Sequence, residues 1–419
     1  MRSLPSGAAL LLCASVTAAC SRNERAVAAA ATPSAKYLMV WAGPQSTSGM
    51  TMKAGGPDFV AVLDADTTSP NYGAVLSSSA VGSGGMMAHH TEYRFPSGGI
   101  VFADDYEAGR AFLLDVRNPH APRELREVDS VPGFRKPHTF VRLPSGHVLA
   151  TIQYGNGRLA GDPGGLAEFD EDGKLVRSAS SADSTMPGAR IRTYGLEIFP
   201  AIDRVLTTSS PMDTEHVANV VQLWRLSDLR LIKTIALPKT ADSTEVAPFE
   251  IRALPDGRSA MLNSYYCGLY HVSGLDTGSP RVDQVGSLRS PPQTGCSVPV
   301  LVGKYWVLPV AYGRRVISYD VSDPAKPVQV SELQTDSTFL PHWTSADPGS
   351  DRIVLVSQDD GEARVAIIRL DPASGKLSWD ERFHDADRSK HGVSFARTAW
   401  PHGTVTHAVP HGTLFVPGQ

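Results

Sequence analysis

Histidines recur at matching places in a repeated sequence pattern. His89 and His90 stand as a pair, and His138 and His342 each follow a proline directly. Imidazole is a borderline donor that suits copper, zinc, iron and nickel. Three or four neutral imidazoles with an open position would bind a copper ion together with oxygen or a thiol. Neighbouring residues of a strand face opposite sides, so His89 and His90 can share one metal only where the backbone is irregular.

Two carboxylates fall near the same place in other copies of the pattern. Glu250 follows Pro248-Phe249, and Glu197 follows Tyr194-Gly195-Leu196. A buried carboxylate there could orient a metal-binding imidazole or relay protons as a catalytic group. The alternative is a structural carboxylate that is hydrogen-bonded within the fold.

The remaining candidates have weaker patterns. His402 and His411 lie in Pro-His-Gly segments, which usually face solvent. Cys267 and Cys296 could form a disulfide in an oxidising compartment, or could be two buried small residues. A nucleophilic hydrolase is disfavoured, because no Gly-x-Ser-x-Gly motif stands between a strand and a helix.

The pattern that carries the histidines is clearest at residues 136–153, Lys-Pro-His-Thr-Phe-Val-Arg-Leu-Pro-Ser-Gly-His-Val-Leu-Ala-Thr-Ile-Gln. It predicts a strand, a tight turn and a second strand. The pattern recurs about seven times at roughly 45 to 60 residues, the spacing of propeller blades. A third and a fourth strand follow in several copies, and four antiparallel strands make one blade.

These repeats predict an all-β protein, a single seven-bladed β-propeller over residues 36–419. The chain begins with unpartnered strands and ends within a blade, so strands from residues 36–80 are expected to complete the last blade. The innermost strand of each blade lines the central channel. Residues at the position of His138 in different blades are therefore expected to converge there.

The composition agrees with the prediction of an all-β protein. The chain has 419 residues, 42% of them hydrophobic, with 37 glycines and 31 prolines. No long stretch shows apolar residues at helical spacing. The formal charge is −4, and no basic stripe suggests a nucleic-acid partner.

The N-terminus reads as a targeting segment. Arg2, a short apolar run and Thr17-Ala18-Ala19-Cys20 resemble a secretory signal with a bacterial lipobox over residues 1–20. Cys20 would then be the lipidated first residue of the mature chain, and residues 21–35 a flexible tether. The expected location is the periplasm, anchored to the outer membrane by that lipid, or outside the cell if Cys20 is not lipidated.

Several segments, in order along most of the chain, resemble the selenium-binding protein family, which includes bacterial methanethiol oxidase. The segments that carry the resemblance are Asp58-Phe-Val-Ala-Val-Leu-Asp-Ala-Asp66, His89-His90-Thr91, Leu114-Asp-Val-Arg-Asn-Pro-His-Ala-Pro122, Lys136-Pro-His-Thr139, Pro248-Phe-Glu-Ile-Arg252, Tyr319-Asp-Val-Ser-Asp-Pro-Ala-Lys-Pro327 and Gly403-Thr-Val-Thr-His407. The resemblance implies the same seven-bladed propeller.

The resemblance also implies a copper-dependent oxidase that converts methanethiol, oxygen and water to formaldehyde, hydrogen sulfide and hydrogen peroxide. By position, His89, His90, His138 and His407 would form its metal site. One departure concerns the Cys-x-x-Cys that follows the double histidine in many members. Residues 91–98 contain no cysteine here, so selenium binding through such a pair is not expected. The alternative is a non-enzymatic periplasmic propeller that binds a metal or a protein partner.

Overall fold

The computed structural model describes residues 32–44, 56–84, 87–155, 162–212, 217–238, 246–288, 295–357 and 362–418. The expected signal peptide, Cys20 and most of the tether lie outside these residues. Within them the only helix is a single 3-10 turn, η1 (Pro200–Ile202). No helix in the described ranges is long and apolar enough to cross a membrane.

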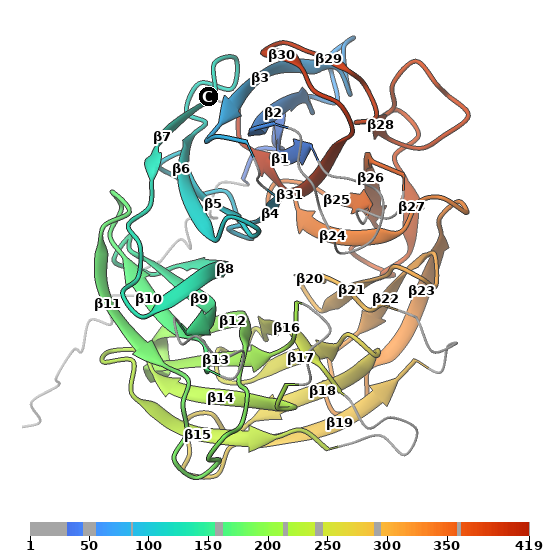
Figure 1. Ribbon diagram of the computed structural model, residues 1–419. Coiled ribbons are helices and arrows are strands. Elements are labelled where there is room, and N and C mark those ends of the chain that lie inside the picture. The colour runs from blue at the N-terminus through green and yellow to red at the C-terminus, as the bar shows by residue number, and fades with distance from the viewer. Residues whose placement is uncertain are drawn as a thin grey trace, which may run out of the picture. The chain divides into compact units, whose positions relative to one another are not determined.

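Seven sheets lie around a common centre as the blades of a β-propeller (Figure 1). The innermost strands are β4 (Ala88–Thr91), β8 (Phe134–Arg142), β12 (Thr193–Phe199), β16 (Pro248–Ala253), β20 (Val300–Val302), β24 (Pro341–Ala346) and β31 (Ala408–Val416). The second strands are β5 (Ile100–Asp105), β9 (Val148–Gly155), β13 (Arg204–Ser209), β17 (Ala260–Ser264), β21 (Tyr305–Val310), β25 (Arg352–Ser357) and β1 (Tyr37–Pro44).

The outer half of each blade is made of two further strands. The third strands are β6 (Arg110–Asp115), β10 (Gly165–Phe169), β14 (Val220–Arg225), β18 (Gly268–Ser273), β22 (Arg315–Asp320), β26 (Arg364–Leu370) and β2 (Asp58–Asp64). The outermost strands are β7 (Arg123–Glu127), β11 (Leu175–Ser180), β15 (Leu231–Ala236), β19 (Arg281–Ser287), β23 (Val328–Gln334), β27 (Leu377–Trp379) and β3 (Val75–Val81). In addition, β28 (Val393–Ser394) pairs with β26, and β29 (Ala399–Trp400) with β30 (Gly403–Thr404).

The last blade joins the two ends of the propeller. Strand β31 pairs antiparallel with β1, from Tyr37 opposite Val416 to Pro44 opposite Ala408. The buried Arg352 of β25 attaches the residues before β1 to the neighbouring blade, because its guanidinium donates to the carbonyl of Ala35 at 2.6 Å. The expectation that strands from residues 36–80 complete the last blade is confirmed.

The repeated pattern folds as a strand, a turn and a second strand. Pro144-Ser145-Gly146 connects β8 to β9, and Gly146 has a φ of 93° that favours glycine. The degenerate copy near Cys296 forms only the short strand β20. Strands in the middle of the blades are buried on both faces, whereas β11 on the outside alternates between half-buried and exposed residues.

Candidate metal centre

Six of the inner strands, within the described part of the chain, have a β-bulge at an equivalent position. A bulge places an extra residue on one strand and re-aims the side chains there. The bulged residues are His89 and His90, His138 and Thr139, Tyr194 and Gly195, Phe249, His342, and His411 and Gly412. The position that recurs in the sequence is therefore a structural feature that the blades share.

The bulge in β4 explains how neighbouring histidines face the same way. Ala88 pairs with Asp105 and Thr91 with Ala103, so His89 and His90 together oppose one residue of β5. The two imidazole rings are stacked, with centroids 4.3 Å apart and planes 13° apart. The backbone irregularity that a shared metal would require is present.

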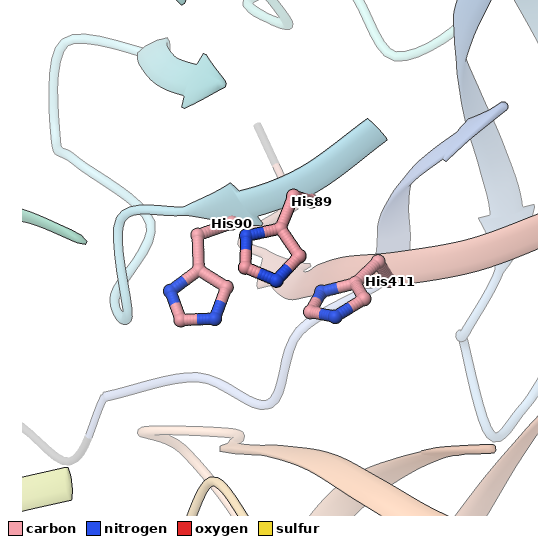
Figure 2. Close-up of side chains that lie close together, drawn as sticks. All are labelled: His89, His90 and His411. Carbon is pink, nitrogen blue, oxygen red and sulfur yellow. The ribbon is translucent and has the colours of Figure 1, made fainter. Parts of the chain in front are cut away.

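His411 of β31 joins this pair from the neighbouring blade (Figure 2). His89, His90 and His411 each offer a ring nitrogen, and these nitrogens lie within 4.8 Å of one another. The ring of His411 has its centroid 4.4 Å from that of His89 and 5.4 Å from that of His90. Three imidazoles from two blades thus face a common point.

His138 and His342 extend the group on either side. The ring of His138, from β8, lies 4.2 Å from that of His90 and 4.9 Å from that of His89, centroid to centroid. The ring of His342, from β24, lies 4.8 Å from that of His411. The five residues His89, His90, His138, His342 and His411 are called the histidine cluster below; they come from four consecutive blades.

Burial keeps the histidine cluster uncharged. His90 and His138 are completely buried, and His89 and His411 are nearly so. Burial lowers the pKa of His89, His90 and His411 well below the usual range of histidine, and neighbouring imidazoles add to the effect. Burial also lowers the pKa of His138 to about 3 and that of His342 to about 4. At neutral pH the imidazoles therefore carry free lone pairs.

Several of these ring nitrogens have no partner in the described part of the protein itself. Within the described residues, each member of the histidine cluster has a buried ring nitrogen without a hydrogen-bond partner, and His90 has two. Unpartnered buried polar atoms are costly and rare in native proteins. A metal ion satisfies such atoms, and neutral imidazole nitrogens suit copper, zinc, iron and nickel. The residues present fit a metal site.

The opposite side of this site is aromatic. Tyr194 and Phe249 occupy the bulges of the next two blades, and the ring of Tyr194 lies 3.9 Å from that of His138. Phe249 packs on Tyr194 at 4.4 Å, and Trp343 lies 5.1 Å from His90. The site therefore combines imidazoles from four blades with an aromatic surface, to which Trp343 of β24 also contributes.

Glu250 is connected to the histidine cluster through Tyr93. The Tyr93 hydroxyl donates to Glu250 at 2.7 Å, and Arg252 donates to the same carboxylate oxygen at 2.8 Å. The Arg252 guanidinium also lies 3.9 Å from the ring centre of Tyr93, and Trp343 stacks on the ring at 5.4 Å. Burial raises the pKa of Glu250, and the charge of Arg252 opposes the rise. The phenol ring of Tyr93 lies 6.2 Å from the ring of His90, centroid to centroid, and the buried carboxylate of Glu250 is bonded to that phenol.

The other two predicted site residues lie elsewhere. Glu197 of β12 is half-buried and accepts hydrogen bonds from the amides of Ile198 at 3.1 Å and Ala253 at 3.0 Å, which links two blades. His407 is exposed in the turn before β31, with a φ of 55°. Among the described residues, no ring contact joins His407 to the histidine cluster.

His411 was expected to face solvent in a Pro-His-Gly turn, and this expectation is wrong. Pro410, His411 and Gly412 lie inside β31, and His411 is 6% exposed. The strand approaches β4 so closely that a Cβ on Gly412 would meet Thr91 at 2.7 Å. Proline and glycine are tolerated because the strand is bulged there. His411 directly follows a proline, as His138 and His342 do in their copies of the pattern, and this was the signal that could have identified it.

Cys267 and Cys296 form a disulfide. Both residues are buried, and the bond joins the turn after β17 to the segment that leads to β20. It connects two neighbouring blades and leaves neither thiol available as a metal ligand.

Two curated proteins are similar in sequence, and no family model matches the chain. A methanethiol oxidase of Hyphomicrobium sp is 23% identical over 321 residues, which covers 70% of this chain and 69% of the relative. A methanethiol oxidase of Ruegeria pomeroyi is 24% identical over 342 residues, or 72% of this chain and 74% of the relative. These relatives support the family resemblance found in the sequence and an oxidase-like function.

Solved structures show the same fold. A hypothetical selenium-binding protein from Sulfolobus tokodaii superimposes with a TM-score of 0.74 at 15% identity, covering 91% of this chain and 94% of that one. A periplasmic gluconolactonase of Pseudomonas aeruginosa gives a TM-score of 0.60 at 13% identity, covering 91% and 99%. These two solved structures share the propeller fold but have different protein names, which agrees with the rule that a fold does not determine function.

Proposed function

We propose that the protein is a copper-dependent oxidase of small thiols, with methanethiol as the model substrate and O₂ as the oxidant. The observation that carries the proposal is the histidine cluster, in which neutral imidazoles from four blades gather and in which His89, His90 and His411 each offer a nitrogen within 4.8 Å of the others. The two relatives named methanethiol oxidase support the choice of reaction.

The metal ligands would come from the histidine cluster. His89, His90 and His411 supply the nitrogens that already lie together, and His138 and His342 are the further donors at hand. His411 takes the place that the sequence resemblance gave to the exposed His407. Bound copper would supply one-electron redox chemistry and affinity for a thiolate sulfur.

The other groups of the site would act on the substrate and on protons. Tyr194, Phe249 and Trp343 offer an apolar surface that suits a methyl group and excludes water. Glu250, which accepts the hydrogen bond from Tyr93, is the carboxylate placed to hold a proton beside the site. Glu197 already accepts two backbone hydrogen bonds, so Glu250 is the preferred catalytic candidate of the two.

The direct test loads the purified protein with copper and follows methanethiol with O₂. The proposal expects thiol-dependent oxygen uptake and release of formaldehyde, hydrogen sulfide and hydrogen peroxide. The Tyr194→Phe protein, which keeps the aromatic surface, should retain this activity. A copper-loaded wild type that leaves methanethiol unchanged would instead indicate a metal-binding protein without this oxidase activity.

We further propose a periplasmic location with a lipid on Cys20. The Cys267–Cys296 disulfide supports an oxidising compartment. Expression of wild type and Cys20→Ser in a Gram-negative host tests this location. The wild type should sediment with membranes and the variant should become soluble in the periplasm. Equal membrane association of both proteins would argue against the lipid.

A further inference from the structure

In two blades of the propeller, the residue opposite the bulge is a threonine that makes the same hydrogen bonds. In the blade of β8, the Thr151 hydroxyl accepts a hydrogen bond from the amide of Thr139 at 3.0 Å. In the blade of β12, the Thr208 hydroxyl accepts one from the amide of Gly195 at 2.8 Å. The second strand thus satisfies an amide that the bulge removes from the sheet.

Each of these threonines also connects its blade to the next one. Thr151 donates to the carbonyl of Tyr194 at 2.8 Å, and Thr208 donates to the carbonyl of Phe249 at 2.6 Å. A hydroxyl can accept one hydrogen bond and donate another, which suits both parts of the task.

Asp104 occupies the corresponding place opposite His89 and His90. Its Oδ1 accepts a hydrogen bond from the amide of His90 at 2.6 Å, as the threonine hydroxyls do in their blades. An ionised carboxylate has no proton to donate to the next blade. Asp104 is completely buried, and burying an ionised carboxylate costs free energy. An aspartate here therefore costs stability that a threonine would not.

The second oxygen of Asp104 faces an imidazole of the metal site. Within the described residues Oδ2 has no hydrogen-bond partner, and it lies 3.7 Å from Nδ1 of His89. His89 Nδ1 also lacks a partner there. A movement of about 0.8 Å would bring the two atoms to hydrogen-bond distance.

We infer that Asp104 is a positioning residue for the metal site: its Oδ2 accepts a hydrogen bond from Nδ1–H of His89. This bond fixes the tautomer of His89, so that Nε2 carries the lone pair for the metal. Carboxylates that orient metal-binding imidazoles in this way also raise the basicity of the ligand. The inference rests on the proposed metal centre and adds a residue that neither the repeat pattern nor the family resemblance indicated.

Amide capping alone would not require a carboxylate. An asparagine at position 104 would keep an acceptor for the amide of His90 but could not accept from His89 with its amide nitrogen. A threonine at position 104 would match Thr151 and Thr208, which support the bulges in their own blades. Asp104→Asn and Asp104→Thr therefore separate the support of the bulge from the orientation of His89.

The test measures copper(II) affinity by competition with a chelator for the full-length wild type, Asp104→Asn and Asp104→Thr. Both variants should bind copper about 10 to 100 times more weakly than wild type. Thr208→Val, which removes the equivalent amide acceptor beside Tyr194, is the matched control and should bind within about twofold of wild type. Circular dichroism confirms that each protein is folded.

A second readout does not involve the metal. Nitrogen-15 NMR of the histidines in the copper-free protein should show His89 protonated on Nδ1 in wild type and a changed tautomer distribution in Asp104→Asn. Unchanged copper affinity in both Asp104 variants, or His89 protonated on Nε2 in wild type, would overturn the inference. A wild type that binds no copper would refute the proposed metal centre itself, which is a separate result.

Discussion

Acid should destabilise the metal-free protein through two members of the histidine cluster. His138 has a pKa of about 3 and His342 of about 4 in the folded protein, against an ordinary value of 6.5. Because the folded values are depressed, the unfolded chain takes up protons first as the pH falls. The free energy of unfolding is therefore highest above pH 6.5, where these imidazoles are neutral in both states, and it falls as the pH drops below that value.

The magnitude follows from the difference between the pH and the ordinary value. At pH 5.0 each of the two imidazoles is protonated in the unfolded chain and neutral in the folded one. The difference of about 1.5 pH units costs about 2 kcal/mol for each residue. His138 and His342 together should remove about 4 kcal/mol from the free energy of unfolding between pH 7.5 and pH 5.0.

The assay is urea unfolding of chelator-treated protein at the two pH values. His138→Asn and His342→Asn should each lose about 2 kcal/mol less than wild type on acidification. His407→Asn is the control, because His407 is exposed and asparagine tolerates its positive φ. The reasoning is refuted if the His138 and His342 variants both show the same acid-induced loss as wild type.

Two further predictions concern groups beside the site. Tyr93→Phe removes the hydroxyl that donates to the buried Glu250 and should lower the free energy of unfolding by about 1–3 kcal/mol. Urea titration measures this, and no change would show that the carboxylate does not depend on the phenol. Replacing Cys267 and Cys296 by serine removes a crosslink across 29 residues and should cost about 3–4 kcal/mol. Dithiothreitol should shift the melting temperature of wild type only, and an equal shift in the double variant would contradict this.

Much of the fold could be predicted because the repeat is local. A strand, a turn with glycine at a positive φ and a second strand leave a pattern within about 18 residues, as at positions 136–153. Ring closure followed from the unpartnered strands at the start of the chain. The Cys267–Cys296 disulfide was one of two alternatives that the sequence left open, since the residue pattern alone does not say whether the two buried cysteines are close enough to bond.

The site was predicted less completely, for a physical reason. His89, His90, His138 and His342 were placed by the repeat, and all four lie in the histidine cluster. His411 was assigned to a turn because proline and glycine flank it, although a bulge makes both acceptable inside β31.

Asp104 lies in the second strand of its repeat, whereas the histidine pattern is confined to the first strands. Its difference from Thr151 and Thr208 becomes visible when the second strands are aligned through the bulges.

The central claim is a metal site formed by the histidine cluster, and metal analysis of two variants tests it most directly. Wild type, His411→Ala and His407→Ala would be loaded with copper, desalted and analysed by mass spectrometry for bound metal. The account predicts about one copper per chain in wild type and in His407→Ala, and a large loss in His411→Ala. Full copper retention by His411→Ala, or loss from His407→Ala alone, would contradict it.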